Sequence, residues 1–314
     1  MKRRHPIRVK FETWLTRLAF SIIPRLPRRV VYTLSRILGY AAYRFSGRLR
    51  NIGFANLDLA FGDSITANRK REILKHSFQS FSLVLLDAFW FSRDSHERIG
   101  RHVLFDPAYE VMFREKPHVC LTAHYGNWEA LGMAITSKGY PLHSVAKPLK
   151  NEEVDRLFID ARNKTGQKIV RREGAVRTLL RILKEGGKIG LVLDQNTKIS
   201  EGGRFFSFFD VPVLVSTAAA GLAIKTNTDV ILCMMKPGND GIYRADYCQE
   251  VPISPYLEID TDAAVDQLTA YITKAMEDYI RAHPDHWLWT YKRWKYIKPG
   301  DDPERYPFYR RKAV

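Results

Sequence analysis

The segment VCLTAHYGNWEALGMAITS, residues 119–137, carries the change of pattern that decides the fold. Its first five residues form a short apolar run that predicts a buried strand, and Glu129–Ser137 has the pattern of a helix. Gly126 and Asn127 lie between the two and are typical of a tight turn and a helix cap. The segment therefore predicts a strand that turns directly into a helix, with His124 at the end of the strand.

Strand-like and helical segments continue to alternate toward the C-terminus. The predicted strands are Leu142–Ala146, Lys168–Val170, Ile189–Leu193, Val211–Val215, Val230–Met235 and Tyr243–Tyr247, and the predicted helices are Glu152–Lys164, Ala175–Lys184, Ala218–Lys225 and Ala263–Arg281. Helices of this length can cross over a sheet and return the chain to a parallel strand. We therefore expect an α/β fold with a mostly parallel central sheet covered by helices.

The chain is expected to have two parts. Residues 1–50 form a basic amphipathic helical region, and residues 51–314 form a single domain. Within that domain we expect a helical lead-in over 51–116, an α/β core over 117–300 and a basic C-terminal tail. The lead-in contains an amphipathic helix over residues 68–92.

The first fifty residues are unusually basic. They contain thirteen Lys or Arg residues and one acidic residue, a net charge of +12 out of +16 for the whole chain. Two apolar stripes at helical spacing are separated by Pro24 and Pro27; the stripes are Phe11, Trp14, Leu15, Leu18, Ile22 and Leu34, Ile37, Leu38, Ala41, Phe45. The pattern favours two helices lying on an anionic membrane surface, although helices that only cap the core would share it. No stretch reaches the roughly 20 apolar residues of a spanning helix.

His124 and Glu129 form the candidate catalytic pair. Ligands of open α/β sheets bind at the carboxyl ends of strands, where His124 is expected. Across the turn, Glu129 could accept a hydrogen bond from one ring nitrogen and leave the other to take a proton from a hydroxyl. Because the pattern includes no nearby Ser or Cys nucleophile, it favours direct attack by a substrate hydroxyl. A thioesterase or lipase would need a Gly-x-Ser-x-Gly elbow, which the sequence lacks. The structural alternative has His124 in the core and Glu129 stabilising a helix N-terminus.

Other candidate residues follow the predicted strand Ile189–Leu193. Asp194 and Gln195 are interpreted as substrate-binding residues of the same cleft, although a turn or cap role fits them equally well. Asn127 is a further candidate for substrate binding. Four phenylalanines, Phe205, Phe206, Phe208 and Phe209, could wall an acyl groove or pack in the core.

Several function classes lack their signatures in this chain. The positive charge permits a nucleic-acid-binding protein, but no helix-turn-helix, zinc-finger or aromatic RNA-binding pattern accompanies it, so this stays a distant alternative. No metal-ligand spacing or nucleotide loop is present, and no cofactor or metal is expected. The three cysteines are far apart and are expected to be buried, reduced thiols.

A series of short motifs is spread over about residues 36–297. They are Asn56-Leu57 with Ala60-Phe61, the His-Tyr-Gly-Asn-Trp-Glu block at 124–129, Asp194-Gln195, Phe208-Phe209 with Pro212, and His283-Pro284 with Trp287-Leu288-Trp289 and Arg293-Trp294-Lys295. In these motifs and in their order the chain resembles the bacterial lipid A biosynthesis acyltransferase family, the lauroyl and myristoyl transferases of the HX4E-type superfamily.

This resemblance implies a glycerolipid-acyltransferase-like fold on the cytoplasmic face of the cell inner membrane. It implies His124 and Glu129 as the catalytic pair and Arg162 as a substrate-binding or oxyanion residue; the alternative for Arg162 is a solvated helix face. The donor is then an acyl thioester of acyl carrier protein or coenzyme A, and the acceptor a lipid A-type glycolipid. Asp210 and Tyr291 depart from the family pattern, so another glycolipid or a lysophospholipid stays open as the acceptor.

Overall fold

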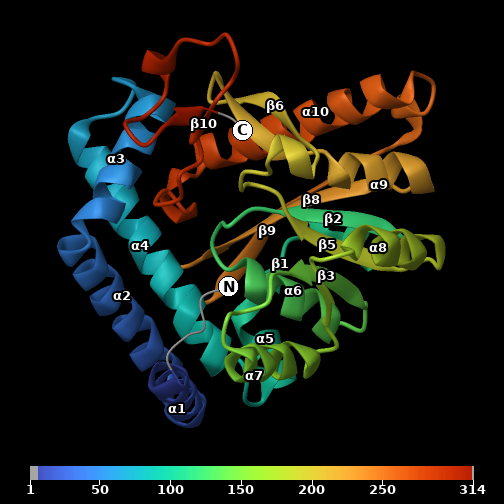
Figure 1. Ribbon diagram of the computed structural model, residues 1–314. Helices are drawn as coiled ribbons and strands as arrows, with labels where there is room; N and C mark the ends of the chain where they lie inside the picture. Colours follow the sequence, from blue (N-terminus) through green and yellow to red (C-terminus); the bar gives the residue numbers. More distant parts are fainter. Residues whose placement is uncertain (1–5, 313–314) are drawn as a thin grey trace.

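A seven-stranded sheet forms the centre of the protein (Figure 1). The computed structural model describes residues 6–312, and the strands of this sheet lie in the order β1-β9-β8-β2-β5-β3-β4. Their bounds are β1 Val103–Phe105, β2 His118–Thr122, β3 Leu142–Ala146, β4 Lys168–Arg171, β5 Lys188–Val192, β8 Val230–Pro237 and β9 Tyr243–Val251. Only β8 and β9 pair antiparallel in this sheet. The predicted α/β fold with a mostly parallel sheet is confirmed.

Helices cover both faces of the sheet, with α5, α6 and α7 on one face and α8, α9 and α10 on the other (Figure 1). Their bounds are α5 Ser95–His102, α6 Trp128–Ser137, α7 Glu152–Asn163, α8 Ala175–Lys184, α9 Ala218–Thr226 and α10 Thr261–Ala282. Side chains alternate along β2, so Val119 and Leu121 enter the core beneath α8–α10, whereas Cys120 enters the core beneath α6. This two-sided burial explains why β2 reads as a continuous apolar run.

Four helices at the N-terminal end run along one side of the sheet (Figure 1). They are α1 Pro6–Ile22, α2 Arg28–Phe45, α3 Gly47–Phe61 and α4 Ala67–Trp90, with a short 3₁₀ turn, Ile23–Arg25, between the first two. Helix α2 packs closely along α4 at Gly39. A Cβ at this position would come within 2.5 Å of the Cα of Gln79, so only glycine allows this approach. Within residues 6–312, no helix is both long and apolar enough to span a bilayer.

One predicted strand lies outside the main sheet. Val211–Ser216 (β7) pairs antiparallel with Gly203–Phe208 (β6) in a separate hairpin. Its two-residue turn, Phe209 and Asp210, has positive φ at both positions, as a tight hairpin of this kind requires. Phe209 is buried and its ring packs edge-on against Phe208, so these two phenylalanines belong to the core, one of the two roles considered for them. Shorter elements are β10 Tyr296–Ile297, β11 Arg311–Lys312 and the 3₁₀ turns Pro107–Phe113, Ile199–Glu201, Ser254–Tyr256, Pro284–His286 and Pro303–Arg305.

Candidate active site

The carboxyl ends of β2 and β5 open into a cleft of about 880 Å³. Because β2 and β5 are neighbours in the sheet, the residues that follow each strand meet at the same edge. His124 follows β2 and Gln195 follows β5, and both line the cleft. Glu129, from α6, and Arg162, from α7, line it as well. Four of the residues singled out from the sequence therefore share one cavity.

Asp194 holds His124 through both its side chain and its backbone. Nδ1 of the imidazole lies 2.7 Å from Oδ1 of Asp194, and the backbone N–H of His124 donates to Oδ2 at 3.0 Å. The indole N–H of Trp287 also donates to Oδ2, at 2.8 Å. With the carboxylate at Nδ1, that nitrogen carries the proton, and Nε2 presents a lone pair on the other side of the ring. There the side-chain nitrogen of Gln195 lies 3.2 Å from Nε2.

The two partners shift each other's pKa in opposite directions. Burial lowers the pKa of His124, but the charge of Asp194 and the hydrogen bond to it raise this pKa, with a further contribution from Glu129, so that it lies above its usual value. Burial raises the pKa of Asp194. The charge of His124, the hydrogen bonds from His124 and Trp287, and the charge of Arg293 together lower this pKa by more than burial raises it, so that it lies below its usual value. Asp194 is therefore ionised next to an imidazole that gains a proton readily.

Glu129 does not accept the imidazole hydrogen bond that the sequence predicted for it. Its carboxylate accepts two bonds from Arg162 instead, from Nε at 2.8 Å and from Nη2 at 3.0 Å. Helix α6 begins at Trp128, and the indole of that residue lies edge-on to the His124 ring with the ring centroids 4.7 Å apart. Trp128 thus flanks the imidazole, and Glu129 in the first turn of α6 reaches across to the last turn of α7.

Asn127 lies outside the cleft, contrary to the substrate contact predicted for it. Its side chain is 1% exposed, and its Oδ1 accepts the backbone N–H of Ala130 at 2.9 Å, which caps α6. Its amide nitrogen donates to Asp87 and to the hydroxyl of Tyr243, at 3.1 Å and 3.0 Å. The cap role predicted for Asn127 is confirmed, and the residue serves to fix the turn.

A C-terminal segment packs against the His124 turn, residues 123–127 between β2 and α6, and the local sequence pattern did not predict this contact. The backbone N–H of Gly126 donates to the carbonyl of His286 at 2.9 Å, and that of Leu288 donates to the carbonyl of His124 at 3.1 Å. A Cβ on Gly126, whose φ is +52°, would come within 1.8 Å of the carbonyl oxygen of Met235. The turn is thus held between β8 and residues 286–288. The tryptophan-rich block around Trp287 was the signal that could have indicated this packing.

Apolar side chains line much of the remaining cleft. Helix α6 contributes Leu131 and Ile135, β3 contributes Leu142, and β5 contributes Leu191. Gly132 allows the side-chain amide of Gln167 to pack against α6 at the wall of the cleft, since a Cβ there would come within 2.7 Å of the side-chain nitrogen of Gln167. A cavity lined by apolar side chains together with polar ones such as His124 and Gln195 suits a molecule that has both a hydrocarbon part and a polar group.

The regions of this chain that match known proteins include the residues of this site. A family model described as bacterial lipid A biosynthesis acyltransferase matches residues 1–296. The chain is 23% identical over 296 residues to the lipid A biosynthesis palmitoleoyltransferase of Escherichia coli strain K12, which covers 92% of this chain and 93% of the relative. It is 23% identical over 304 residues to the lauroyltransferase of lipid A biosynthesis from the same strain, covering 93% and 95%. It is also 23% identical over 236 residues to the phosphatidylinositol mannoside acyltransferase of Mycolicibacterium smegmatis, covering 71% and 72%.

Proposed function

Because this chain belongs to the bacterial lipid A biosynthesis acyltransferase family, and is an acyltransferase, we propose that it moves a fatty acyl chain from an acyl thioester to a hydroxyl group of a glycolipid. The observation that carries this proposal is His124, held by Asp194 at the polar edge of a largely apolar cleft. The acceptor we favour is a lipid A-type precursor, because two of the relatives are named for lipid A biosynthesis. Another glycolipid or a lysophospholipid is the alternative.

In the reaction that we propose, His124 is the general base. Its Nε2 takes the proton of the acceptor hydroxyl while the hydroxyl oxygen attacks the carbonyl carbon of the thioester. The tetrahedral intermediate then collapses, the carbon–sulfur bond breaks, and the imidazolium returns the proton to the departing sulfur. Asp194 keeps the proton on Nδ1 and stabilises the imidazolium. Gln195, at 3.2 Å from Nε2, occupies the position of a hydrogen-bond donor to the base and marks where the hydroxyl binds.

Glu129 and Arg162 act in this scheme as one unit across the cleft. The two parallel hydrogen bonds fix the guanidinium in a single orientation toward the cavity. A fixed cation at this edge can stabilise the negative charge that develops on the thioester oxygen. Glu129 thereby acts through Arg162, and its charge also favours the imidazolium.

Replacement of Glu129 by glutamine tests this unit. Glutamine places an NH₂ donor where one carboxylate oxygen now accepts a guanidinium N–H, so the parallel pair of hydrogen bonds is lost together with the charge. Arg162 then loses its orientation, and kcat should fall by about 10²-fold with little change in the KM for the lipid. Steady-state kinetics of the purified protein measure both constants. Glu201→Gln is the matched control, because Glu201 lines the same cleft and pairs with Arg172 at 2.6 Å. A raised KM as the only change would instead make Glu129 a substrate-binding residue.

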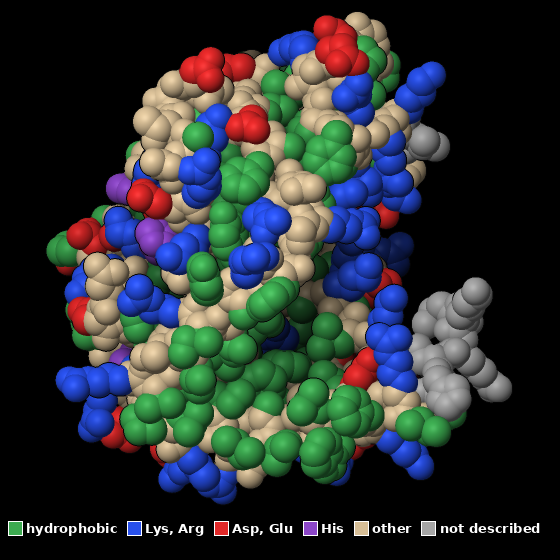
Figure 2. Space-filling view, turned by 90° about the vertical axis from the view of Figure 1, so that its left-hand side faces the viewer, with side chains coloured by type: hydrophobic (Ala, Val, Ile, Leu, Met, Phe, Trp, Pro, Cys, Tyr) green, Lys and Arg blue, Asp and Glu red, His purple; other side chains and the backbone are tan. Residues whose placement is uncertain are grey.

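We further propose that helix α1 binds an anionic membrane surface. Its apolar side chains face outward and are 38–71% exposed; they are Ile7, Phe11, Trp14, Leu15, Leu18 and Ile22. Its opposite side packs on the protein, where Thr13 is buried and Phe20 contacts Phe89 and Phe158. Figure 2 shows hydrophobic side chains gathered around a hollow on the face that carries α1, α2 and α4, with Lys and Arg side chains along its edge. An apolar surface flanked by cations suits a membrane with anionic headgroups.

The route from that surface to the base is short. Phe81 and Leu85 of α4 are 37% and 53% exposed. The ring of Phe81 stacks on Trp128 with the ring centroids 6.5 Å apart, and Trp128 flanks His124. An acceptor lipid could therefore reach the cleft while its hydrocarbon part stays in contact with apolar side chains.

A double substitution in α1, Trp14→Gln with Leu18→Gln, tests membrane binding. Each side chain should lose roughly 1.5 kcal/mol of apolar transfer, so partitioning onto phosphatidylglycerol-containing vesicles should weaken by about 10²-fold. Vesicle flotation measures this change. The control is Leu257→Gln with Tyr271→Gln, two side chains that are each 43% exposed outside the N-terminal helices. Undiminished flotation of the α1 variant would rule out this helix as the membrane contact.

The acceptor is identified by assay. The purified protein is incubated with lauroyl-carrier protein or lauroyl-coenzyme A and, in separate reactions, with a lipid A precursor, a phosphatidylinositol mannoside or a lysophospholipid. Mass spectrometry detects the gain of one acyl chain, and glycolipids of cells with and without the protein give the same comparison in vivo. Absence of transfer to every lipid acceptor would contradict the proposed function.

A further inference from the structure

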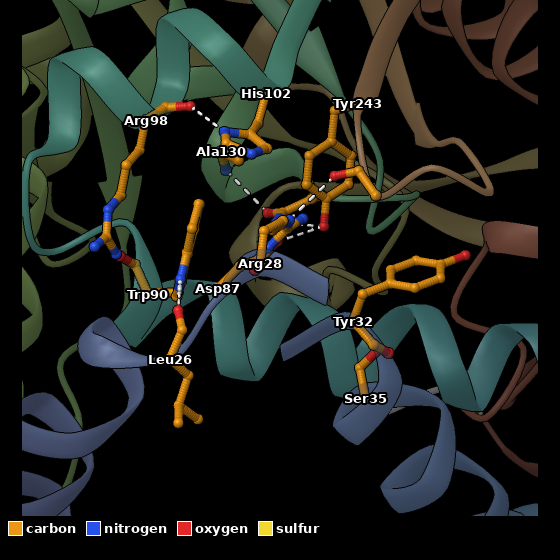
Figure 3. Close-up of polar contacts among 12 residues, drawn as sticks. Leu26, Arg28, Tyr32, Ser35, Asp87, Trp90, Arg98, His102, Ala130 and Tyr243 are labelled. Carbon is orange, nitrogen blue, oxygen red and sulfur yellow. Dashed lines mark hydrogen bonds and ion pairs between the residues drawn. The ribbon is translucent and has the colours of Figure 1, made fainter. Parts of the chain in front are cut away.

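Arg28, Asp87 and Tyr243 form a buried polar network (Figure 3). They come from α2, α4 and β9, none of which lines the cleft, and Asn127 joins them to the proposed catalytic turn, residues 123–127. Asp87, in the last turn of α4, is 1% exposed and stands at its centre. Arg28, the first residue of α2, forms an ion pair with it and has a side chain that is 10% exposed. Tyr243, the first residue of β9, and Asn127 of the catalytic turn complete the network. Three segments that are distant in sequence thus converge on one carboxylate next to the turn.

The two oxygens of Asp87 accept four hydrogen bonds. Oδ1 accepts from Nη1 of Arg28. Oδ2 accepts from Nη2 of Arg28 at 3.2 Å, from the amide nitrogen of Asn127 at 3.1 Å and from the hydroxyl of Tyr243 at 2.6 Å. Only an ionised carboxylate, which has no donor of its own, can satisfy all four donors at once.

We propose that Asp87 is a positioning residue for acyl transfer, which sets the catalytic turn through Asn127 and couples that turn to the N-terminal helices through Arg28. The inference rests on the proposed role of the His124 turn. Asn127 has little freedom, because its nitrogen is held by Asp87 and Tyr243 while its oxygen caps α6 at Ala130. The orientation of that amide therefore fixes where α6 begins, and with it the places of Trp128 and Glu129.

Energetics favour a positioning role over a purely stabilising one. The desolvation of two buried charges commonly offsets their attraction, so an apolar pair of similar volume would serve stability as well. A carboxylate that accepts from four directions has one arrangement, and it therefore restricts the geometry of its partners. Burial lowers the pKa of Arg28, but Asp87 and Tyr243 raise it further, so that it lies above its usual value and the guanidinium is charged.

The same network fastens the N-terminal helices to the core. Nε of Arg28 donates to the carbonyl of Gly241 at 3.1 Å, and its guanidinium lies 4.9 Å from the ring centroid of Trp90. The indole of Trp90 donates to the carbonyl of Leu26 at 3.0 Å, and Arg98 donates to that of Pro24 at 2.7 Å. The linker between α1 and α2 is thus held by polar contacts at the end of α4 that carries Asp87. Movement of this linker would displace Arg28, the ion-pair partner of Asp87, and would thereby shift Asp87 and the Asn127 side chain that is bonded to it.

The test compares Asp87→Asn, Asn127→Asp and the double variant in the full-length protein. In Asp87→Asn the side-chain NH₂ group faces donors, so kcat should fall by about 10²-fold with the KM for the lipid retained. Exchanging the two residues restores one donor and one acceptor between positions 87 and 127 and keeps the net charge, so the double variant should recover most of kcat. The acid limb of the pH profile should stay in place, because Asp194 still holds His124.

Glu277→Gln is the matched control. Glu277 is a buried carboxylate, 2% exposed, that accepts from Arg281 at 3.0 Å and from the backbone of Phe209 at 2.6 Å, away from the turn. Its substitution should lower thermal stability and leave kcat unchanged. If Asp87→Asn also lowers thermal stability and leaves kcat unchanged, the positioning role is refuted. The same holds if the double variant regains stability but not kcat.

A second measurement separates this inference from the proposed function. Hydrogen–deuterium exchange of the peptide over residues 126–131 should be several-fold faster in Asp87→Asn than in Glu277→Gln, because the Ala130 N–H loses its fixed acceptor. This readout needs no substrate. An inactive wild-type protein with the expected exchange pattern would overturn the proposed function alone. If the wild-type protein is active but the peptide over residues 126–131 exchanges hydrogen no faster in Asp87→Asn than in Glu277→Gln, the positioning role alone is overturned. If Asp87→Asn does not fold, Tyr243→Phe removes one donor and keeps the ion pair, and it should give a smaller loss of kcat in the same direction.

Discussion

Replacement of His124 by alanine is expected to lower the rate of acyl transfer by about 10²–10⁴-fold, the usual contribution of a general base. The loss should appear in kcat, because the apolar lining of the cleft and the Glu129–Arg162 pair are retained. Single-turnover transfer from an acyl thioester to the lipid acceptor measures it. His143→Ala is the control; this residue lies on the nearby strand β3, with Nδ1 3.3 Å from the carbonyl of Lys188.

The control should keep near wild-type activity, and both variants should keep the circular dichroism spectrum of the folded protein. A His124→Ala protein that transfers acyl chains at close to the wild-type rate would show that another group removes the hydroxyl proton. The general-base mechanism would then have to be abandoned, although membership of the family would stand.

Replacement of Asp194 by asparagine should be almost as damaging. The carboxylate holds the proton on Nδ1 of His124, and an asparagine could present its amide nitrogen there, which would favour the wrong tautomer of the ring. A loss of kcat on the order of 10²–10⁴-fold is expected, with little change in the binding of the acyl donor. Asn196→Ala is a neighbouring control, because the side chain of Asn196 bonds to the carbonyl of Lys292 and not to His124.

The pH profile gives this second prediction a signature. The base acts as neutral imidazole, so the rate should rise with pH through the pKa of His124, which lies above its usual value in the wild type. Burial lowers that pKa, and the charge of Asp194 is what raises it. Without this charge the acid limb of Asp194→Asn should move to lower pH while the plateau falls. A limb that stays in place would show that Asp194 does not control the protonation of His124.

The fold and the centre of the site were predictable where the pattern is local. The strand, turn and helix around His124 follow from an apolar run, a glycine and an asparagine that are adjacent in sequence. The partner of His124 was not predictable from spacing. Glu129 is five residues away, but it lies in the first turn of α6 and its carboxylate accepts from Arg162, whereas Asp194 is brought in by the pairing of β2 with β5. Sheet order, and not sequence distance, selects the carboxylate.

The polar network around Asp87 could not be predicted from the sequence for a different reason. Asp87 lies in the apolar C-terminal part of α4, between Leu86 and Ala88, and nothing in that local pattern indicates a buried ion pair. Its burial depends on Arg28 and Tyr243, which are far apart in the sequence. Contacts of this kind arise from tertiary packing and leave no periodic signal in the sequence.

The pairing of Tyr125 with Trp287 has a consequence for the order in which a newly made chain becomes competent. Residues 286–288 supply backbone partners to the catalytic turn, although they lie more than 150 positions further along the chain. A ribosome must therefore reach residue 288 before the turn can close, and closure requires a contact of long sequence separation, which forms slowly. The N-terminal helices leave the ribosome long before that point. The growing chain thus presents the outward apolar helix α1 before the contacts that hold the His124 turn can form.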